Sequence, residues 1–119
     1  LHMDERERQR LDKILTAIAN DSRETFGNKL EAVILYGSYA RGDYDEDSDI
    51  DVMVLVNMDR EALLNYERGF SRLASRLSLA DDDCTTISLL LNSWPHVEKW
   101  LPHIPFYQNV MRAGGRIRA

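Results

Sequence analysis

Two carboxylates one residue apart are the part of this sequence best suited to chemistry. Asp49 and Asp51 stand where an apolar, strand-like segment begins. In an extended strand alternate side chains share a face, so these two would point the same way, about 6.5–7 Å apart. Two like charges held that close at the edge of an apolar segment repel unless a cation lies between them. The pair therefore predicts a magnesium site.

A Gly-Ser turn precedes the acid pair and suits a phosphate. The apolar segment 31–36 predicts a strand, and Gly37-Ser38 leads from it into a short helix predicted over 38–42. Gly37 lets backbone approach a ligand without a Cβ in the way. The free N–H groups at the helix start and the Ser38 hydroxyl can bind phosphate oxygens. One half of this arrangement would hold a triphosphate, and the other would hold its metal.

Two other phosphate or metal motifs are excluded by the residues present. Gly37 and Gly42 have the glycine spacing of a P-loop, but Asp43-Tyr44 follows where that motif needs Lys and then Ser or Thr. An EF-hand loop begun at an acid within 43–47 has no glycine at its sixth position and no glutamate at its twelfth.

The remaining pattern predicts the elements that position these residues. An amphipathic helix covers 4–26 and stops at Gly27-Asn28. A second strand covers 48–56, and a third covers 84–91. Between them Asp59 caps a helix, and prolines divide the tail into short helical pieces that end near 109–112. The helix after Asp59 has its apolar stripe at positions three and four apart: Leu63, Tyr66, Phe70, Leu73 and Leu77.

These elements predict one α/β (α+β) domain over residues 4–119, with a small sheet of about three or more strands flanked by helices. Strand directions are left open, and a mixed sheet fits as well as a parallel one. Residues 1–3 look like the remnant of a cloning linker and are excluded from this fold.

Composition narrows the class of function. The 119 residues carry a net charge of −5, which argues against a nucleic-acid partner. Basic residues do cluster in the first helix, and we interpret them as its solvated face: Arg6, Arg8, Arg10 and Lys13. No apolar run is long enough to span a bilayer. The single cysteine, Cys84, fits a reducing compartment and predicts a cytoplasmic protein.

The run Gly37-Ser38-Tyr39-Ala40-Arg41-Gly42 with Ser48-Asp49-Ile50-Asp51 resembles the signature of the polymerase-β-type nucleotidyltransferase superfamily. Its small branch, the minimal nucleotidyltransferases, is similar in length, and the tail Pro105-Phe106-Tyr107-Gln108-Asn109-Val110 resembles the C-terminal helix of that branch. The resemblance implies that fold and a transfer of a nucleoside monophosphate, AMP from ATP or another nucleotide from its triphosphate, with release of pyrophosphate. It also implies an antitoxin that modifies a partner toxin of the HEPN type. Apart from the resemblance, the chain has little room after the third strand for an acceptor-binding domain, so we expect a partner protein or a homo-oligomer to supply the missing wall.

The resemblance also implies the site residues and their metal. Asp49 and Asp51 would hold one or two magnesium ions, and Gly37, Ser38 and Arg41 would contact the nucleotide. The family usually places a third carboxylate on the strand predicted here over 84–91, but that segment has no acid. Asp83, at its entrance, is the best candidate for a third catalytic and metal-binding residue.

Four alternatives stay open on these residues. The acids at 81–83 fit a solvated turn as well as a catalytic role. Arg41 can contact phosphate or pair with an acid of the loop 43–47, and the pair is slightly favoured. Without a third acid, the chain can be a catalytically degenerate module that binds a partner. A small-molecule transferase of the antibiotic-modifying kind is weaker, because such enzymes usually need a second domain.

Overall fold

The computed structural model describes residues 3–113 and 115–117. In chain order the elements are α1 (Glu5–Phe26), the 3₁₀ turn η1 (Gly27–Lys29), β1 (Leu30–Tyr36), α2 (Gly37–Arg41), β2 (Ile50–Val56), α3 (Arg60–Leu63), the 3₁₀ turn η2 (Leu64–Tyr66), α4 (Glu67–Ala80), β3 (Ile87–Ser93), α5 (Trp94–Trp100), α6 (Pro105–Ala113) and β4 (Gly115–Ile117). Of the predicted linker remnant at residues 1–3, residues 1 and 2 lie outside the described part, and Met3 packs against the core.

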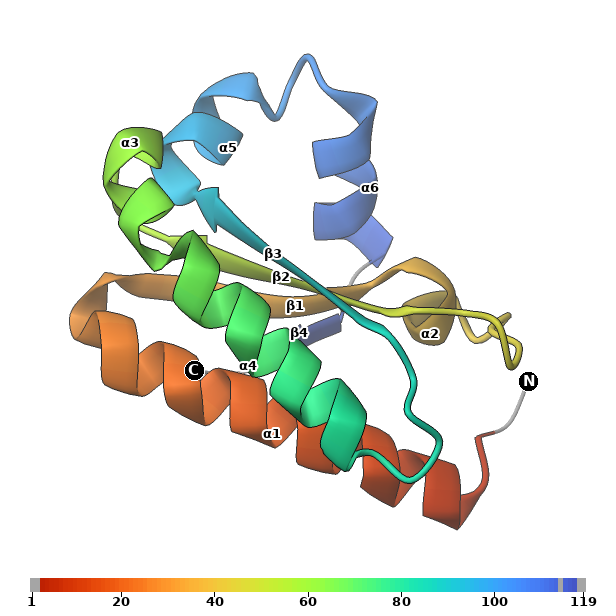
Figure 1. Cartoon of the computed structure of the whole chain (residues 1–119). Coiled ribbons are helices and arrows are strands. Elements are labelled where there is room, and N and C mark those ends of the chain that lie inside the picture. The colour runs from red at the N-terminus through yellow and green to blue at the C-terminus, as the bar shows by residue number, and fades with distance from the viewer. Residues whose placement is uncertain (1–2, 114, 118–119) are drawn as a thin grey trace.

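The strands form one mixed sheet in the order β3-β2-β1-β4 (Figure 1). β1 pairs antiparallel with β2 and with β4, whereas β2 and β3 are parallel. The predicted small mixed sheet flanked by helices is therefore confirmed, and the strand directions that the sequence left open are settled. Among the described helices, none is long and apolar enough to cross a membrane.

Helices cover both faces of this sheet. α1 and α4 lie on one face, and α5 and α6 lie on the other (Figure 1). Alternation along the strands supplies both cores, because odd and even positions point to opposite faces. The main core joins the α1 stripe to even positions of β2, and the second core joins odd positions of β2 to Val97 and Val110. Sharing the second core are Ala32, Ile34, Met53 and Leu55.

α1 follows its sequence pattern closely. The Asp4 side chain caps it by accepting a hydrogen bond from the Glu7 N–H at 2.8 Å. The helix ends at Gly27, as its sequence predicts. The apolar stripe that predicts this helix is buried throughout: Leu11, Ile14, Leu15 and Ile18.

The single helix predicted after Asp59 is instead divided into α3, η2 and α4. Asp59 occupies the cap position, but its side chain makes no capping hydrogen bond. The turn η2 has about three residues per turn, so Leu63 and Tyr66, three apart, can both face the core. Leu63 is buried there, and the Tyr66 ring lies 4.9 Å from the Phe26 ring.

The third strand begins three residues later than predicted, at Ile87. Side chains form hydrogen bonds with the backbone of the preceding loop, at Thr85. The Asp81 carboxylate accepts the Thr85 N–H at 3.0 Å, and the Ser78 hydroxyl donates to the Thr85 carbonyl at 2.8 Å. β3 then continues to Ser93, whose hydroxyl caps α5 by accepting from the His96 N–H. β4 was not predicted, because three residues are too few to show alternation.

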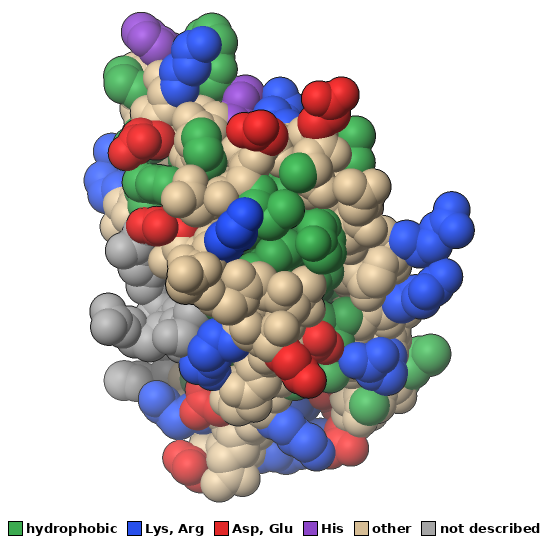
Figure 2. Space-filling model, turned by 90° about the vertical axis from the view of Figure 1, so that its left-hand side faces the viewer, with side chains coloured by type: hydrophobic (Ala, Val, Ile, Leu, Met, Phe, Trp, Pro, Cys, Tyr) green, Lys and Arg blue, Asp and Glu red, His purple; other side chains and the backbone are tan. Residues whose placement is uncertain are grey.

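Part of the surface beside α3 is apolar. Figure 2 shows hydrophobic side chains gathered on the side of the molecule where α3 lies, with acidic and basic side chains around them. A hollow of about 650 Å³ is lined by residues of α3, η2, β3 and α6. Leu64, Leu90 and Phe106 line it and are exposed large hydrophobic residues.

Candidate functional site

The Gly-Ser turn and the second carboxylate of the pair meet where β1 ends. Tyr36, the last residue of β1, is the register partner of Asp51. Gly37 has a φ of +73°, a conformation that L side chains rarely adopt. A Cβ added to Gly37 would lie 2.2 Å from Asp51 Oδ2. Glycine is therefore required here for two reasons: the positive φ, and the Asp51 carboxylate that occupies the place of a Cβ.

Asp49 lies just before β2 rather than in it, because the strand begins at Ile50. The two carboxylates still act on each other. Burial raises the pKa of Asp51, and the charge of Asp49 raises it further, while the charge of Arg41 lowers it. None of the ion pairs among the described side chains includes Asp49 or Asp51. The pair is a concentration of negative charge that the protein leaves largely uncompensated.

The register of β3 identifies a neighbour that the sequence did not assign to the site. Ser88 is the parallel partner of Asp51, so the two residues share a face of the sheet. That face is the one covered by α5 and α6, because Met53 and Leu55, at the same alternation as Asp51, belong to the second core. Ser88 is exposed and places a hydroxyl where a third carboxylate aligned with the pair would stand. Only the strand register reveals this, and the sequence does not give it.

The nucleotide-contacting candidates lie on α2. Ser38 falls inside that helix, and Tyr36 takes the cap position, so Ser38 is not an N-cap. The Ser38 carbonyl accepts the Gly42 and Asp43 N–H groups at 2.9 and 3.2 Å, which closes the short helix. Arg41 Nε lies 3.3 Å from Asp43 Oδ2, the loop pairing that the sequence slightly favours. Both of these side chains are largely exposed, so Arg41 is free to exchange partners.

Asp83 is bound by two arginines of α1. Its two oxygens are 3.3 Å from Arg6 Nη2 and 3.5 Å from Arg10 Nε. Within the part of the chain that the structure describes, no three His, Cys, Asp or Glu side chains form a metal-ligand group. A metal-binding role for Asp83 stays a prediction, and it requires this side chain to leave both arginines.

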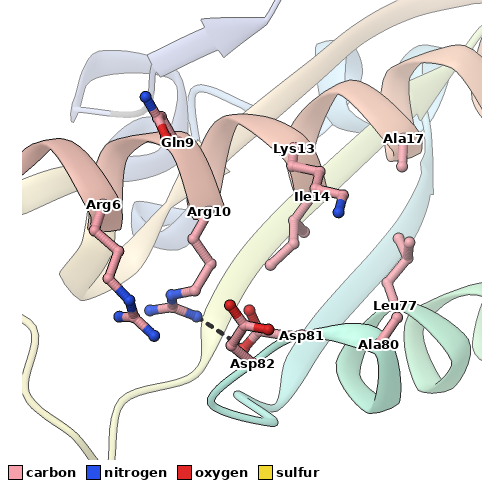
Figure 3. Close-up of a pocket in the computed structure, with 10 residues that line it drawn as sticks. All are labelled: Arg6, Gln9, Arg10, Lys13, Ile14, Ala17, Leu77, Ala80, Asp81 and Asp82. Carbon is pink, nitrogen blue, oxygen red and sulfur yellow. Dashed lines mark hydrogen bonds and ion pairs between the residues drawn. The ribbon is translucent and has the colours of Figure 1, made fainter.

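The neighbouring Asp81 is structural. Arg10 reaches from α1 across a hollow to the end of α4 and binds Asp81 at 2.8 Å (Figure 3). The Arg10 and Asp81 side chains are only 9% and 1% exposed. Burial alone would raise the pKa of Asp81, but hydrogen bonds from the Thr85 N–H and from Arg10 hold it below its ordinary value. The interpretation of Arg10 as part of a solvated helix face is therefore wrong, because the two side chains bury each other. Of the two alternatives left open for the acids at 81–83, the solvated turn does not hold for Asp81.

A strongly acidic hollow of about 780 Å³ lies at the end of the sheet where β2 and β3 begin. Arg10 is its one basic lining residue, and six carboxylates also line it: Glu7, Asp45, Glu46, Asp47, Asp49 and Asp83. Such a hollow repels a triphosphate.

Comparison with known proteins agrees with this geometry. A family model described as a nucleotidyltransferase domain matches residues 12–107. A protein of Methanocaldococcus jannaschii, provisionally named a protein adenylyltransferase, is 43% identical over 70 residues, which are 59% of this chain and 69% of that protein. The protein adenylyltransferase MntA of Thermococcus cleftensis is 41% identical over 46 residues, 39% of this chain and 44% of that protein.

The fold is also found in a solved structure. The crystal structure of a provisionally named nucleotidyltransferase from Sulfolobus solfataricus matches with a TM-score of 0.60. The match covers 98% of this chain and 89% of that one, at 17% identity. With the family model extending from α1 into α6, the chain belongs to the nucleotidyltransferase domain family, as the residues of its Gly-Ser turn and its acid pair predict.

Proposed function

We propose that this protein transfers a nucleoside monophosphate, AMP from ATP, to a hydroxyl of an acceptor protein in a magnesium-dependent reaction. The observation that carries the proposal is the packing of the Asp51 carboxylate against Gly37, which puts an uncompensated acid at the turn that precedes α2. Relatives named protein adenylyltransferases support AMP as the transferred group and a protein as its acceptor.

Asp49 and Asp51 fit magnesium. Their donors are carboxylate oxygens, which this ion prefers, and their mutual repulsion makes a cation favourable between them. A divalent ion bound there would stabilise negative charge on the α-phosphate. Asp83 remains a candidate third ligand, should it leave Arg6 and Arg10.

The residues of α2 would contact the triphosphate. The Asp51 carboxylate occupies the space that a Cβ of Gly37 would take, so the contacts to phosphate would come from the first N–H groups of the helix, which have no partner within it. Ser38 adds a hydroxyl. Arg41 would exchange the exposed Asp43 carboxylate for a phosphate, a change that costs little because exposed ion pairs contribute about 0–1 kcal/mol.

The partner follows from the family resemblance of the sequence. We propose a HEPN-type toxin as the acceptor protein, with a homo-oligomer as the second arrangement, and we place the reaction in the cytoplasm. Cys84 is free and exposed, which suits a reducing compartment.

The test measures transfer of label from ATP, labelled at the α-phosphate, to a candidate toxin with and without magnesium. The candidate toxin is the product of a gene next to the gene of this protein. We expect label on the toxin only with magnesium, and none with Asp49→Asn or Asp51→Asn. Asp12→Asn, an exposed acid on α1, is the matched control and should leave transfer intact. Transfer that persists in Asp51→Asn would reject this site.

A second candidate function is a partner-binding module of the same fold that performs no chemistry. Two observations favour it: Asp83 is held by arginines, and the hollow between α3 and α6 exposes Leu64 and Leu90. Calorimetry separates the two functions. Toxin binding with no binding of ATP or GTP in magnesium would establish the module, whereas nucleotide binding that Asp51→Asn abolishes would establish the transferase.

A further inference from the structure

A second hollow opens directly beside the acid pair, between α2 and α6. Its volume is about 420 Å³, within the roughly 300–1,000 Å³ of small-molecule sites. Gly37 lines it and also touches Asp51, so the hollow and the acid pair are continuous through one residue. Asp51 and the hollow lie on the same face of the sheet, since Val110 of α6 lines the hollow and belongs to the second core.

The walls of this hollow are mainly apolar and aromatic. Phe106 is 43% exposed, and its ring packs edge-on against Tyr36, with 5.7 Å between ring centroids and 82° between planes. Opposite α6, Ala40 of α2 contributes only a methyl group. An aromatic ring held in place by a second ring, facing an open space, is a surface on which a flat ligand can stack.

One side-chain amide gives the hollow a polar edge that presents hydrogen-bond donors. Asn109 lines it, and its Oδ1 accepts a hydrogen bond from Arg112 Nη2 at 2.7 Å. With its acceptor occupied, the amide offers its N–H donors to a ligand. Arg41 lines the same hollow and supplies positive charge at the end near Asp51.

We propose that the hollow between α2 and α6 is the nucleoside subsite of the transferase, with a purine base stacked on Phe106 and an acceptor atom of its edge bound by Asn109. The inference rests on the proposed function, which puts the triphosphate at Gly37 and the acid pair. From there an attached nucleoside can enter either this hollow or the acidic one. The four carboxylates of the acidic hollow that are not proposed metal ligands disfavour a nucleotide: Glu7, Asp45, Glu46 and Asp47. An apolar wall with one donor edge matches a base.

The experiment measures binding of ATP, GTP and inorganic tripolyphosphate to the full chain by calorimetry in magnesium. Phe106→Ala should weaken ATP and GTP about tenfold, because base stacking is lost, and leave tripolyphosphate unchanged. Asn109→Asp keeps the acceptor for Arg112 but removes the donors, and it should weaken both nucleotides more than tripolyphosphate. Leu64→Ala removes an exposed apolar side chain that does not line this hollow, and it should leave the binding of all three ligands unchanged.

The outcomes separate this inference from the function beneath it. Asp51→Asn should weaken ATP and tripolyphosphate together, since both need the metal. If that occurs while Phe106→Ala leaves ATP unchanged, the subsite is rejected and the proposed function stands. If wild-type protein binds neither ATP nor tripolyphosphate, the proposed function fails and the subsite fails with it.

Discussion

Two groups of acids that look alike in the sequence are treated in opposite ways by the fold. Asp49 and Asp51 lie at the start of β2 without an ion-pair partner among the described side chains, and the pKa of Asp51 is raised by burial and by Asp49. Asp81 lies at the end of α4 against the buried Arg10, and its pKa is lowered in spite of burial. Asp83, two residues later, is also bound to arginines.

The difference concerns charge compensation rather than the number of acids. A carboxylate that gains a guanidinium partner and a backbone N–H donor on folding stabilises the fold. A carboxylate that folding leaves beside another carboxylate costs free energy, and such sites are enriched in functional roles. We therefore assign the acid pair to the proposed site, whereas Asp81 stabilises the fold.

The largest expected effect separates these two roles in one experiment. Asp51→Asn should lower nucleotidyl transfer at least about a hundredfold, equivalent to ~2.7 kcal/mol, without lowering the free energy of unfolding. Asp81→Asn should do the reverse: it destabilises by about 2 kcal/mol, and each folded molecule retains its activity. Label transfer and urea unfolding of both variants test this. Equal loss of activity in the two folded variants would contradict the comparison.

Removing the arginine partner of Asp81 should have an effect of similar size. Arg10→Met leaves Asp81 buried without its cation and should lower the free energy of unfolding by about 3 kcal/mol. Arg76→Met is the matched control, because it removes only an exposed ion pair with Asp21 and should cost at most about 1 kcal/mol. Chemical unfolding measures both, and similar costs would show that Arg10 contributes little as a buried cation.

A pair of glycine substitutions tests the contact at the acid pair. Gly37→Ala should destabilise by about 1–2 kcal/mol because of its positive φ, and it should also impair transfer by displacing Asp51. Gly69→Ala in α4 has open space around its Cβ and an ordinary φ, so it should stabilise by about 0.5 kcal/mol. Unfolding and transfer assays distinguish them. Normal transfer by Gly37→Ala would show that the close packing of Asp51 is not needed.

Local signals in the sequence were enough for much of the fold and for the turn and the acid pair that the structure brings together. The stripe from Leu11 to Ile18 predicts α1 correctly, and the turn at Gly37 is recognisable because glycine has a distinct backbone requirement. Long-range pairing was not predictable. The neighbour Ser88 depends on the β2–β3 register, and the structural role of Asp81 depends on Arg10, 71 residues earlier. The acids at 81–83 fitted a solvated turn and a catalytic role equally well, because the distant partner of Asp81 was not known from the sequence.

The smallest effect is a difference in pH dependence with opposite signs in the two groups. Because its folded pKa is raised, Asp51 contributes stability that is fully present below its ordinary value of 3.8 and is lost as pH rises through the folded pKa. Asp81 has a lowered folded pKa, so its contribution is present above 3.8 and is lost as pH falls through that lower value.

Relative to wild type, the Asp51→Asn variant should therefore have a higher free energy of unfolding at pH 7, and this difference should vanish below pH 3.8. The Asp81→Asn variant should have a lower free energy of unfolding at pH 7, and this difference should shrink only as pH falls below 3.8. Urea unfolding from pH 3 to 7 measures both curves, and curves of the same sign would mean that the two groups of acids do not differ in compensation.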